Sequence, residues 1–199
     1  MDGNTVFAFI QRIHMRAFYW ILVGSWAAFV LTWFGAAWRN KRTVRHGRAM
    51  VPSAAGFIVF VLLLHLLLQR LPKGLVTPSP SVARGLLGSI LCVGGIAYAI
   101  RARLALGRNW GLPMSQRENP ELVTAGPYAR VRHPIYSGVV LALLGSAVVT
   151  GVAGLVVALA MAAYFLASAF REEGRLRSEF PEAFPAYQAR TTRFIPFLF

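Results

Sequence analysis

The sequence predicts an all-α integral membrane protein with about five transmembrane helices. Of its 199 residues, 56% are hydrophobic, and the mean hydropathy is +0.54, which is typical of membrane proteins rather than soluble domains. Crossing a hydrocarbon core of about 30 Å takes about 20 helical residues, and several apolar stretches reach that length. No repeat, low-complexity tract or linker divides the chain, so we expect one membrane domain over residues 1–199.

Three crossings are predicted in the first half of the chain. Ala17–Trp38 is the first, and it stops at a basic segment. Val51–Leu68 is the second and contains His65, for which we expect a hydrogen-bonded packing role. Val82–Leu106 is the third. Arg84, Arg101 and Arg103 lie near its ends, where long side chains are expected to reach water.

The last apolar region, Ile135–Ala169, is too long for one crossing and long enough for two. Thr150, Gly151 and Gly154 offer the plausible turn within it. The region therefore predicts a tight C-terminal helical hairpin, which brings the number of crossings to five.

Basic residues set the expected orientation. The loop 39–48 carries five lysines and arginines, more than the loop that follows the second crossing. The positive-inside rule places such a loop in the cytoplasm. By alternation, residues 107–134 and the tail from Arg171 are cytoplasmic and the N-terminus is outside. We expect the host to be the bacterial inner membrane.

The formal net charge of +14 raises the question of a polyanionic partner. No nucleic-acid-binding motif is present, and the basic residues cluster beside apolar stretches, so anionic membrane lipids are the expected partner and nucleic acid is not. The single cysteine, Cys92, lies in an apolar stretch and excludes an internal disulfide or a thiolate metal cluster. We expect no metal.

Polar residues gather where the last apolar region begins and where it ends. Tyr128, Arg132, His133 and Tyr136 precede or open it, and Glu172-Glu173 follow it. A hairpin brings both groups to one face of the membrane. Together they suit a zwitterionic ligand with an aromatic base, such as S-adenosylmethionine. A nicotinamide cofactor has similar groups, although the chain has no G-x-G-x-x-G fingerprint.

Acidic residues follow the same division. Asp2 is the only one in the first half, and six glutamates lie in the two segments placed in the cytoplasm. We therefore expect residues 1–106 to be a three-helix scaffold and residues 107–199 to be a catalytic half with a cytoplasmic cofactor pocket.

Three motifs in this half carry a family resemblance. They are LVTAGPYARVRHPIYSG at 122–138, the Glu172-Glu173 pair followed by PEAFPAY at 181–187, and RFIP at 193–196. In combination they resemble the isoprenylcysteine carboxyl methyltransferase family, over roughly residues 107–196. The wider superfamily includes phospholipid N-methyltransferases and bacterial thiol methyltransferases. The R-H-P-x-Y element at 132–136 also resembles one in membrane sterol reductases.

The resemblance implies an integral membrane methyltransferase that uses S-adenosylmethionine and an amphiphilic, lipid-like acceptor. Arg132 would orient a carboxylate acceptor, which needs no base, whereas a thiol or amine acceptor would need one from Glu173, His133 or Tyr136. The cofactor contacts that the resemblance implies are Gln116, Glu121, Leu122, Val123, Tyr128, His133, Pro134, Ile135, Tyr136 and Glu172.

One position departs from the family. Its isoprenylcysteine enzymes place a substrate-binding arginine one turn before the first matched glutamate, where this chain has Ser168. We therefore expect another amphiphile, such as an aminophospholipid or a small apolar thiol. An NADPH-dependent membrane reductase and a non-enzymatic scaffold are the alternatives. Phe180, Tyr187 and Pro196 are expected to dock the tail over the pocket.

Overall fold

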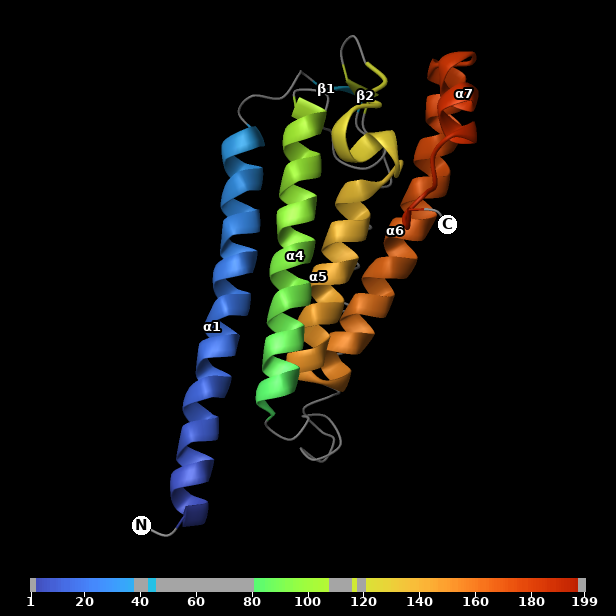
Figure 1. Cartoon of the computed structure of the whole chain (residues 1–199). Helices are drawn as coiled ribbons and strands as arrows, with labels where there is room; N and C mark the ends of the chain where they lie inside the picture. The colour runs from blue at the N-terminus through green and yellow to red at the C-terminus, as the bar shows by residue number, and fades with distance from the viewer. Residues whose placement is uncertain (1–2, 38–42, 46–80, 108–115, 118–120, 197–199) are drawn as a thin grey trace.

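The computed structural model describes residues 3–37, 43–45, 81–107, 116–117 and 121–196. Within them, four long helices lie side by side, and shorter elements cover one end of the bundle (Figure 1). The long helices are α1 (Gly3–Ala37), α4 (Val82–Leu106), α5 (Pro134–Thr150) and α6 (Val152–Glu179). The short elements are α7 (Ala183–Ala189), the 3₁₀ helix η2 (Gly126–Ala129), and strands β1 (Thr43–Arg45) and β2 (Gln116–Arg117). The all-α prediction is confirmed, apart from this small strand pair.

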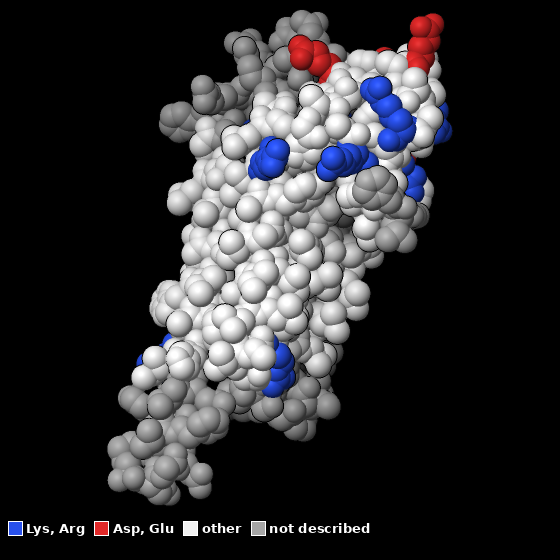
Figure 2. All heavy atoms as spheres, viewed as in Figure 1, with Lys and Arg blue, Asp and Glu red and all other residues white. Residues whose placement is uncertain are grey.

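The helices are those of an integral membrane protein. Three described segments are long and apolar enough to cross a membrane: Ile13–Trp33, Val82–Leu106 and Val152–Glu179. The fourth apolar helix, α5, is shorter. Figure 2 shows charged side chains near the two ends of the visible face, with an uncharged band between them. This is the distribution expected of a protein whose middle faces hydrocarbon.

The predicted crossings are confirmed to different degrees. The third has the predicted bounds, and the first helix begins well before Ala17, at Gly3. The second predicted crossing, with His65, lies outside the described residues. The C-terminal hairpin is confirmed: Gly151 alone makes the turn, with a φ of 84° that favours glycine. Gly154 lies within α6 instead, against Ala147.

Helix α6 continues beyond the predicted end of the apolar region, to Glu179. Charged residues end the hydropathy signal there but not the helix. Arg175 lies 4.0 Å from both Glu172 and Glu179, at i,i+3 and i,i+4 spacings that support a helix. The extension places the two adjacent glutamates on a rigid element at the end of the bundle.

Glycines let α4 and α5 pack with their backbones almost in contact. Gly88 and Gly95 of α4 face Gly145 and Gly138 of α5. A Cβ atom on Gly95 would lie 2.5 Å from the Gly138 carbonyl oxygen. Small residues at helix interfaces are the usual basis of close packing in membranes, because no hydrophobic effect drives the helices together there.

Helix α1 packs against the other side of α4. The Phe18 ring covers Gly85, and Leu22 joins a buried cluster with Cys92 and Ile96. Trp26 Nε1 donates a hydrogen bond of 3.1 Å to Ser146 Oγ of α5. Cys92 is therefore packing in this core, as the sequence indicated.

The chain direction brings the functional segments to one end. Helices α1, α4 and α6 run one way and α5 runs the other, so the start of α5 meets the far end of α6 (Figure 1). β1 pairs with β2 at this same end, with Thr43 opposite Arg117. Thr43–Arg45 of the basic segment and Gln116–Arg117 after α4 therefore share one side, as the predicted alternation requires.

The expectation for Arg103 was wrong. Its side chain does not reach water, because the residue is only 2% exposed. Its Nη1 donates a hydrogen bond of 2.8 Å to the Gly107 carbonyl. Gly107, with a φ of 55°, ends the helix and turns its carbonyl within reach. Arg101, on another face of α4, is exposed as expected.

Candidate active site

The chain before α5 is bound to the C-terminal tail. Val131 and Thr192 form a parallel bridge. The Arg132 N–H donates a hydrogen bond of 2.8 Å to the Thr192 carbonyl, and the His133 N–H donates one of 3.0 Å to the Arg193 carbonyl. Pro134 starts α5 and disfavours a helical conformation for His133, which has a φ of −123° and a ψ of 58°. Its backbone N–H is therefore free to bind the tail rather than the helix.

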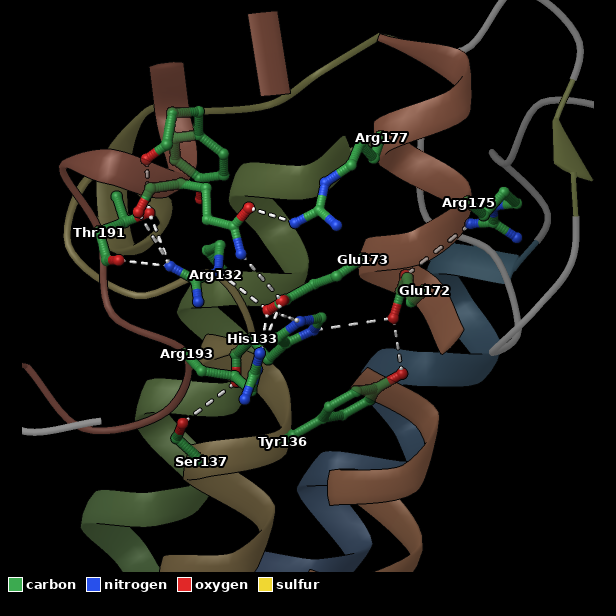
Figure 3. Close-up of polar contacts among 12 residues, drawn as sticks. Arg132, His133, Tyr136, Ser137, Glu172, Glu173, Arg175, Arg177, Thr191 and Arg193 are labelled. Carbon is green, nitrogen blue, oxygen red and sulfur yellow. Dashed lines mark hydrogen bonds and ion pairs between the residues drawn. The ribbon is translucent and has the colours of Figure 1, made fainter. Parts of the chain in front are cut away.

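Glu173 is the centre of a buried ion-pair network (Figure 3). Its Oε1 accepts hydrogen bonds from Arg132 Nε at 2.9 Å and Arg193 Nε at 3.0 Å, and lies 3.2 Å from His133 Nε2. Its Oε2 accepts a bond of 2.9 Å from Arg193 Nη2. The Glu173 side chain is 5% exposed. Two guanidinium groups from separate segments therefore hold one carboxylate away from water.

The arginines of this network also fix the tail. Arg132 Nη1 donates to the carbonyl oxygens of Gln188, at 3.3 Å, and of Thr191. The Arg193 guanidinium stacks over the Phe170 ring of α6 at 4.1 Å. The network thus ties α5, α6 and the segment after α7 into one unit.

Glu172, the neighbouring carboxylate, has a different environment. Its Oε2 accepts a hydrogen bond of 3.0 Å from the Tyr136 hydroxyl and lies 3.7 Å from His133 Nδ1. The Tyr136 ring stacks on Phe165, with centroids 4.4 Å apart, and lies parallel to the His133 ring. The Glu172 side chain is 27% exposed, so this carboxylate can still accept a ligand cation whereas Glu173 cannot.

Two buried tyrosines join η2 to α7. Tyr187 of α7 donates a hydrogen bond of 2.7 Å to the Tyr128 carbonyl. Burial raises the pKa of Tyr187 to about 12, although Arg132 and Arg190 act in the opposite direction. Burial also raises the pKa of Tyr128 well above its usual range. Both phenols are therefore neutral at physiological pH, and Tyr128 is an interior residue, not one of an exposed aromatic belt.

A pocket of about 680 Å³ opens beside these residues, between α4, α5, α6, η2 and the tail. Tyr136 links this pocket to the group of charged residues, because the residue lines the pocket and its hydroxyl donates a hydrogen bond to Glu172. Most lining residues are apolar. They are Tyr98, Arg101, Gly126, Pro127, Arg130, Tyr136, Ser137, Val140, Leu141, Leu144, Ala162, Phe165, Phe194, Ile195 and Pro196.

The structure brings Arg132, His133 and Tyr136 together with both glutamates, as we expected from the predicted hairpin. Other predicted residues lie in separate segments of the chain. Leu122 and Val123 are half-buried and Glu121 is exposed, in the segment before η2, and Gln116 lies in β2. Ser168 lies in α6, one turn before Glu172, and is buried at 1% exposure. Among described residues its hydroxyl has no hydrogen-bond partner.

Sequence reasoning missed the role of Arg193 and of the tail carbonyls. Arg193 opens the RFIP motif, but nothing in the motif indicates its partner. One signal was available: a buried carboxylate must be paired, and Arg193 is the cation at the point where the tail returns. The expected docking of the tail over the pocket is confirmed for Pro196, which lines it, and Ser137 Oγ donates a hydrogen bond of 2.7 Å to the Phe194 carbonyl. Tyr187 binds the Tyr128 carbonyl instead, and neither Tyr187 nor Phe180 lines the pocket.

No group of three or more His, Cys, Asp or Glu side chains suited to a metal ion is found in the described part of the chain. The ion pairs of Glu173 and the lining of the pocket make this a paired-charge site beside an apolar pocket. Its chemistry suits a ligand with a cationic group, held by Glu172, and an apolar portion.

Comparison with known proteins gives related findings. The model of the phospholipid methyltransferase family matches residues 83–183. The cobalt-zinc-cadmium resistance protein CzcN of Cupriavidus metallidurans is 42% identical over 94 residues, which are 46% of this chain and 43% of that protein. The nickel-cobalt-cadmium resistance protein NccN of Alcaligenes xylosoxydans xylosoxydans is 38% identical over 94 residues, 46% of this chain and 44% of that protein. The chain spans less than half the length of these relatives.

A solved structure shares the fold. It is that of the eukaryotic intramembrane Ras methyltransferase, isoprenylcysteine carboxyl methyltransferase. The TM-score is 0.52 at 24% identity, over 78% of this chain and 55% of that chain.

Proposed function

The chain belongs to the phospholipid methyltransferase family and is an integral membrane protein, and from that premise we propose that it transfers the methyl group of S-adenosylmethionine to an amphiphilic acceptor. One observation carries the proposal. Of two adjacent carboxylates at the end of the apolar bundle, Glu173 is buried between two arginines, whereas the Glu172 side chain is 27% exposed and its nearest basic group, His133, is 3.7 Å away.

The residues present fit this cofactor. Its ammonium group needs an accessible carboxylate, and Glu172 supplies one. Its carboxylate needs N–H donors, and the first backbone N–H groups of α5, at Ile135 and Tyr136, have no partner within the helix. Leu122 and Val123, both half-buried, offer apolar surface for an adenine ring. Tyr128, His133 and Pro134 shape the same region from η2 and the start of α5.

The main role of the protein in catalysis is to position the two reactants. When bound, the cofactor supplies an activated methyl group on its sulfonium sulfur, and in-line attack requires the acceptor atom to be aligned with it. Arg132 and Glu173 serve as positioning residues, since they hold the start of α5, α6 and the tail together. An amine or thiol acceptor must lose a proton. The Tyr136 hydroxyl donates a hydrogen bond to the Glu172 carboxylate, so it can take up this proton as it passes its own to Glu172.

The acceptor reaches the site from the membrane. The pocket wall formed by α5 and α6 is apolar, and Tyr136 connects it to the cofactor residues. Ser168 provides no cation one turn before Glu172, so the isoprenylcysteine substrate of the structural neighbour is not extended to this chain. The class of acceptor proposed is a lipid-like molecule with a polar end at the membrane surface.

We propose the orientation and division of the chain on the same basis. Residues 107–199 form the catalytic half and residues 1–106 the scaffold. The basic segment 39–48 favours a cytoplasmic site in a bacterial inner membrane. The pairing of β1 with β2 supports this proposal, because it joins that segment to the site end of the bundle.

The Glu172→Gln variant tests the assignment of the ammonium site. It keeps the shape of the side chain and removes its charge, so we expect binding of S-adenosylhomocysteine to weaken about 10- to 100-fold, the effect of one charge-assisted hydrogen bond. Isothermal titration calorimetry on detergent-solubilised protein measures the change. Glu179→Gln, two turns further along α6, is the matched control and should bind as the unaltered protein does. Equal affinities for all three proteins would remove Glu172 from the site.

A further inference from the structure

Two arginines line the pocket wall nearest the end of α4. Arg101 comes from the last two turns of α4, and Arg130 follows η2, so separate elements bring the two cations to one pocket. Both guanidinium groups lie within electrostatic reach of the Tyr98 hydroxyl, which lines the same pocket. Both residues are exposed. Within the described residues, no ion pair joins either one to a carboxylate.

The remainder of the pocket is apolar. Val140, Leu141 and Leu144 line it from α5, and Ala162 and Phe165 line it from α6. A volume of about 680 Å³ is large enough for an alkyl chain together with a small headgroup. Cations at the opening and hydrocarbon surface behind them match one class of molecule, an amphiphile with an anionic group.

We propose that Arg101 and Arg130 form a clamp for the anionic group of an amphiphile whose apolar chain occupies this pocket. The inference rests on the proposed function in one respect: the amphiphile is the methyl acceptor. The clamp also compensates for Ser168, because it supplies the acceptor with cations from α4 and from the residue after η2 instead of from α6. Two guanidinium groups bind a phosphate or carboxylate through charge-assisted hydrogen bonds. They thereby fix how deeply the chain of the amphiphile enters.

Photo-crosslinking tests the clamp without cofactor or turnover. The protein is reconstituted in phosphatidylcholine nanodiscs and labelled with dodecyl phosphate carrying a diazirine in its chain. The matched probe is the corresponding uncharged dodecyl alcohol. Peptide mapping reports labelling at 137–144 and 162–165, the segments that line the pocket.

The double variant Arg101→Gln/Arg130→Gln should lower labelling by the phosphate probe about tenfold. Labelling by the alcohol should not change, which also shows that the pocket is intact. Arg171→Gln, an exposed arginine of α6 that does not line the pocket, is the control and should label as the unaltered protein does. High salt should weaken only the phosphate probe.

Three results would overturn the clamp. The first is equal labelling of the double variant and the unaltered protein by the phosphate probe, and the second is an equal loss of labelling by both probes in the double variant. The third is an equal loss of phosphate labelling in Arg171→Gln, which would indicate attraction to the whole basic surface. Binding of S-adenosylhomocysteine, measured on the same samples, separates the two proposals. If the clamp is refuted but S-adenosylhomocysteine still binds, the proposed function stands. If the unaltered protein does not bind S-adenosylhomocysteine, the proposed function is refuted.

Discussion

Glu173→Ala is expected to be the most destabilising single substitution at the site. It leaves the guanidinium groups of Arg132 and Arg193 partly buried without their shared carboxylate. Removing one partner of a buried ion pair typically costs about 3–5 kcal/mol, because an uncompensated charge stays behind. The measurement is thermal unfolding in detergent. The tail should also detach, so limited proteolysis should cut the chain around residues 188–196 at temperatures where the unaltered protein resists.

Glu182→Ala provides the control for this experiment. Glu182 is exposed at the start of α7 and makes no side-chain capping bond. Its removal should change the unfolding temperature little, since exposed charges contribute little to stability. If the Glu173→Ala and Glu182→Ala proteins unfold at the same temperature, the ion-pair network does not hold the tail.

Gly95→Ala is expected to separate helices α4 and α5. The added Cβ atom would lie 2.5 Å from both the Gly138 carbonyl oxygen and the Ala142 nitrogen. Both contacts are with backbone, which cannot rotate away as a side chain can. Overpacking of this kind costs about 1–3 kcal/mol, and more where backbones must move. We expect a lower unfolding temperature in detergent and weaker binding of S-adenosylhomocysteine, because α5 carries the site.

Gly94→Ala is the matched control, one residue earlier on the same helix. A Cβ atom there meets nothing within 4 Å. Alanine is also the better helix former, so this variant should be as stable as the unaltered protein or slightly more stable. If both alanine variants behave alike, the close backbone packing of α4 and α5 does not determine stability.

Much of the fold follows from the sequence. Val82–Leu106 lies between Ser81 and Gly107 and is apolar apart from the arginines near its ends, so both helix ends could be predicted. The hairpin turn could be placed because Gly151 is the residue that tolerates its backbone conformation. The end of α6 could not be placed. Membrane crossings are recognised by hydropathy, and the charged residues after Phe170 end that signal while the helix continues.

The site could be located from the sequence but not resolved. The motifs indicated that Arg132, His133 and Tyr136 meet the two glutamates, and the structure agrees. Which glutamate is buried depends on how α6 is rotated against α5. Adjacent helical residues point about 100° apart, and a sequence pattern does not fix that rotation. Arg103 shows the same limit, since a cation near a helix end can reach water or be buried by the neighbouring segment.

The central claim is that this site binds S-adenosylmethionine and not another cofactor. The most direct measurement is thermal unfolding of the detergent-solubilised protein during titration with S-adenosylhomocysteine or NADPH. A ligand of the folded state at 100 times its Kd adds about 2.7 kcal/mol of stability. We expect stabilisation that saturates with S-adenosylhomocysteine and no stabilisation by NADPH. Stabilisation by NADPH alone would contradict the claim and favour a membrane reductase.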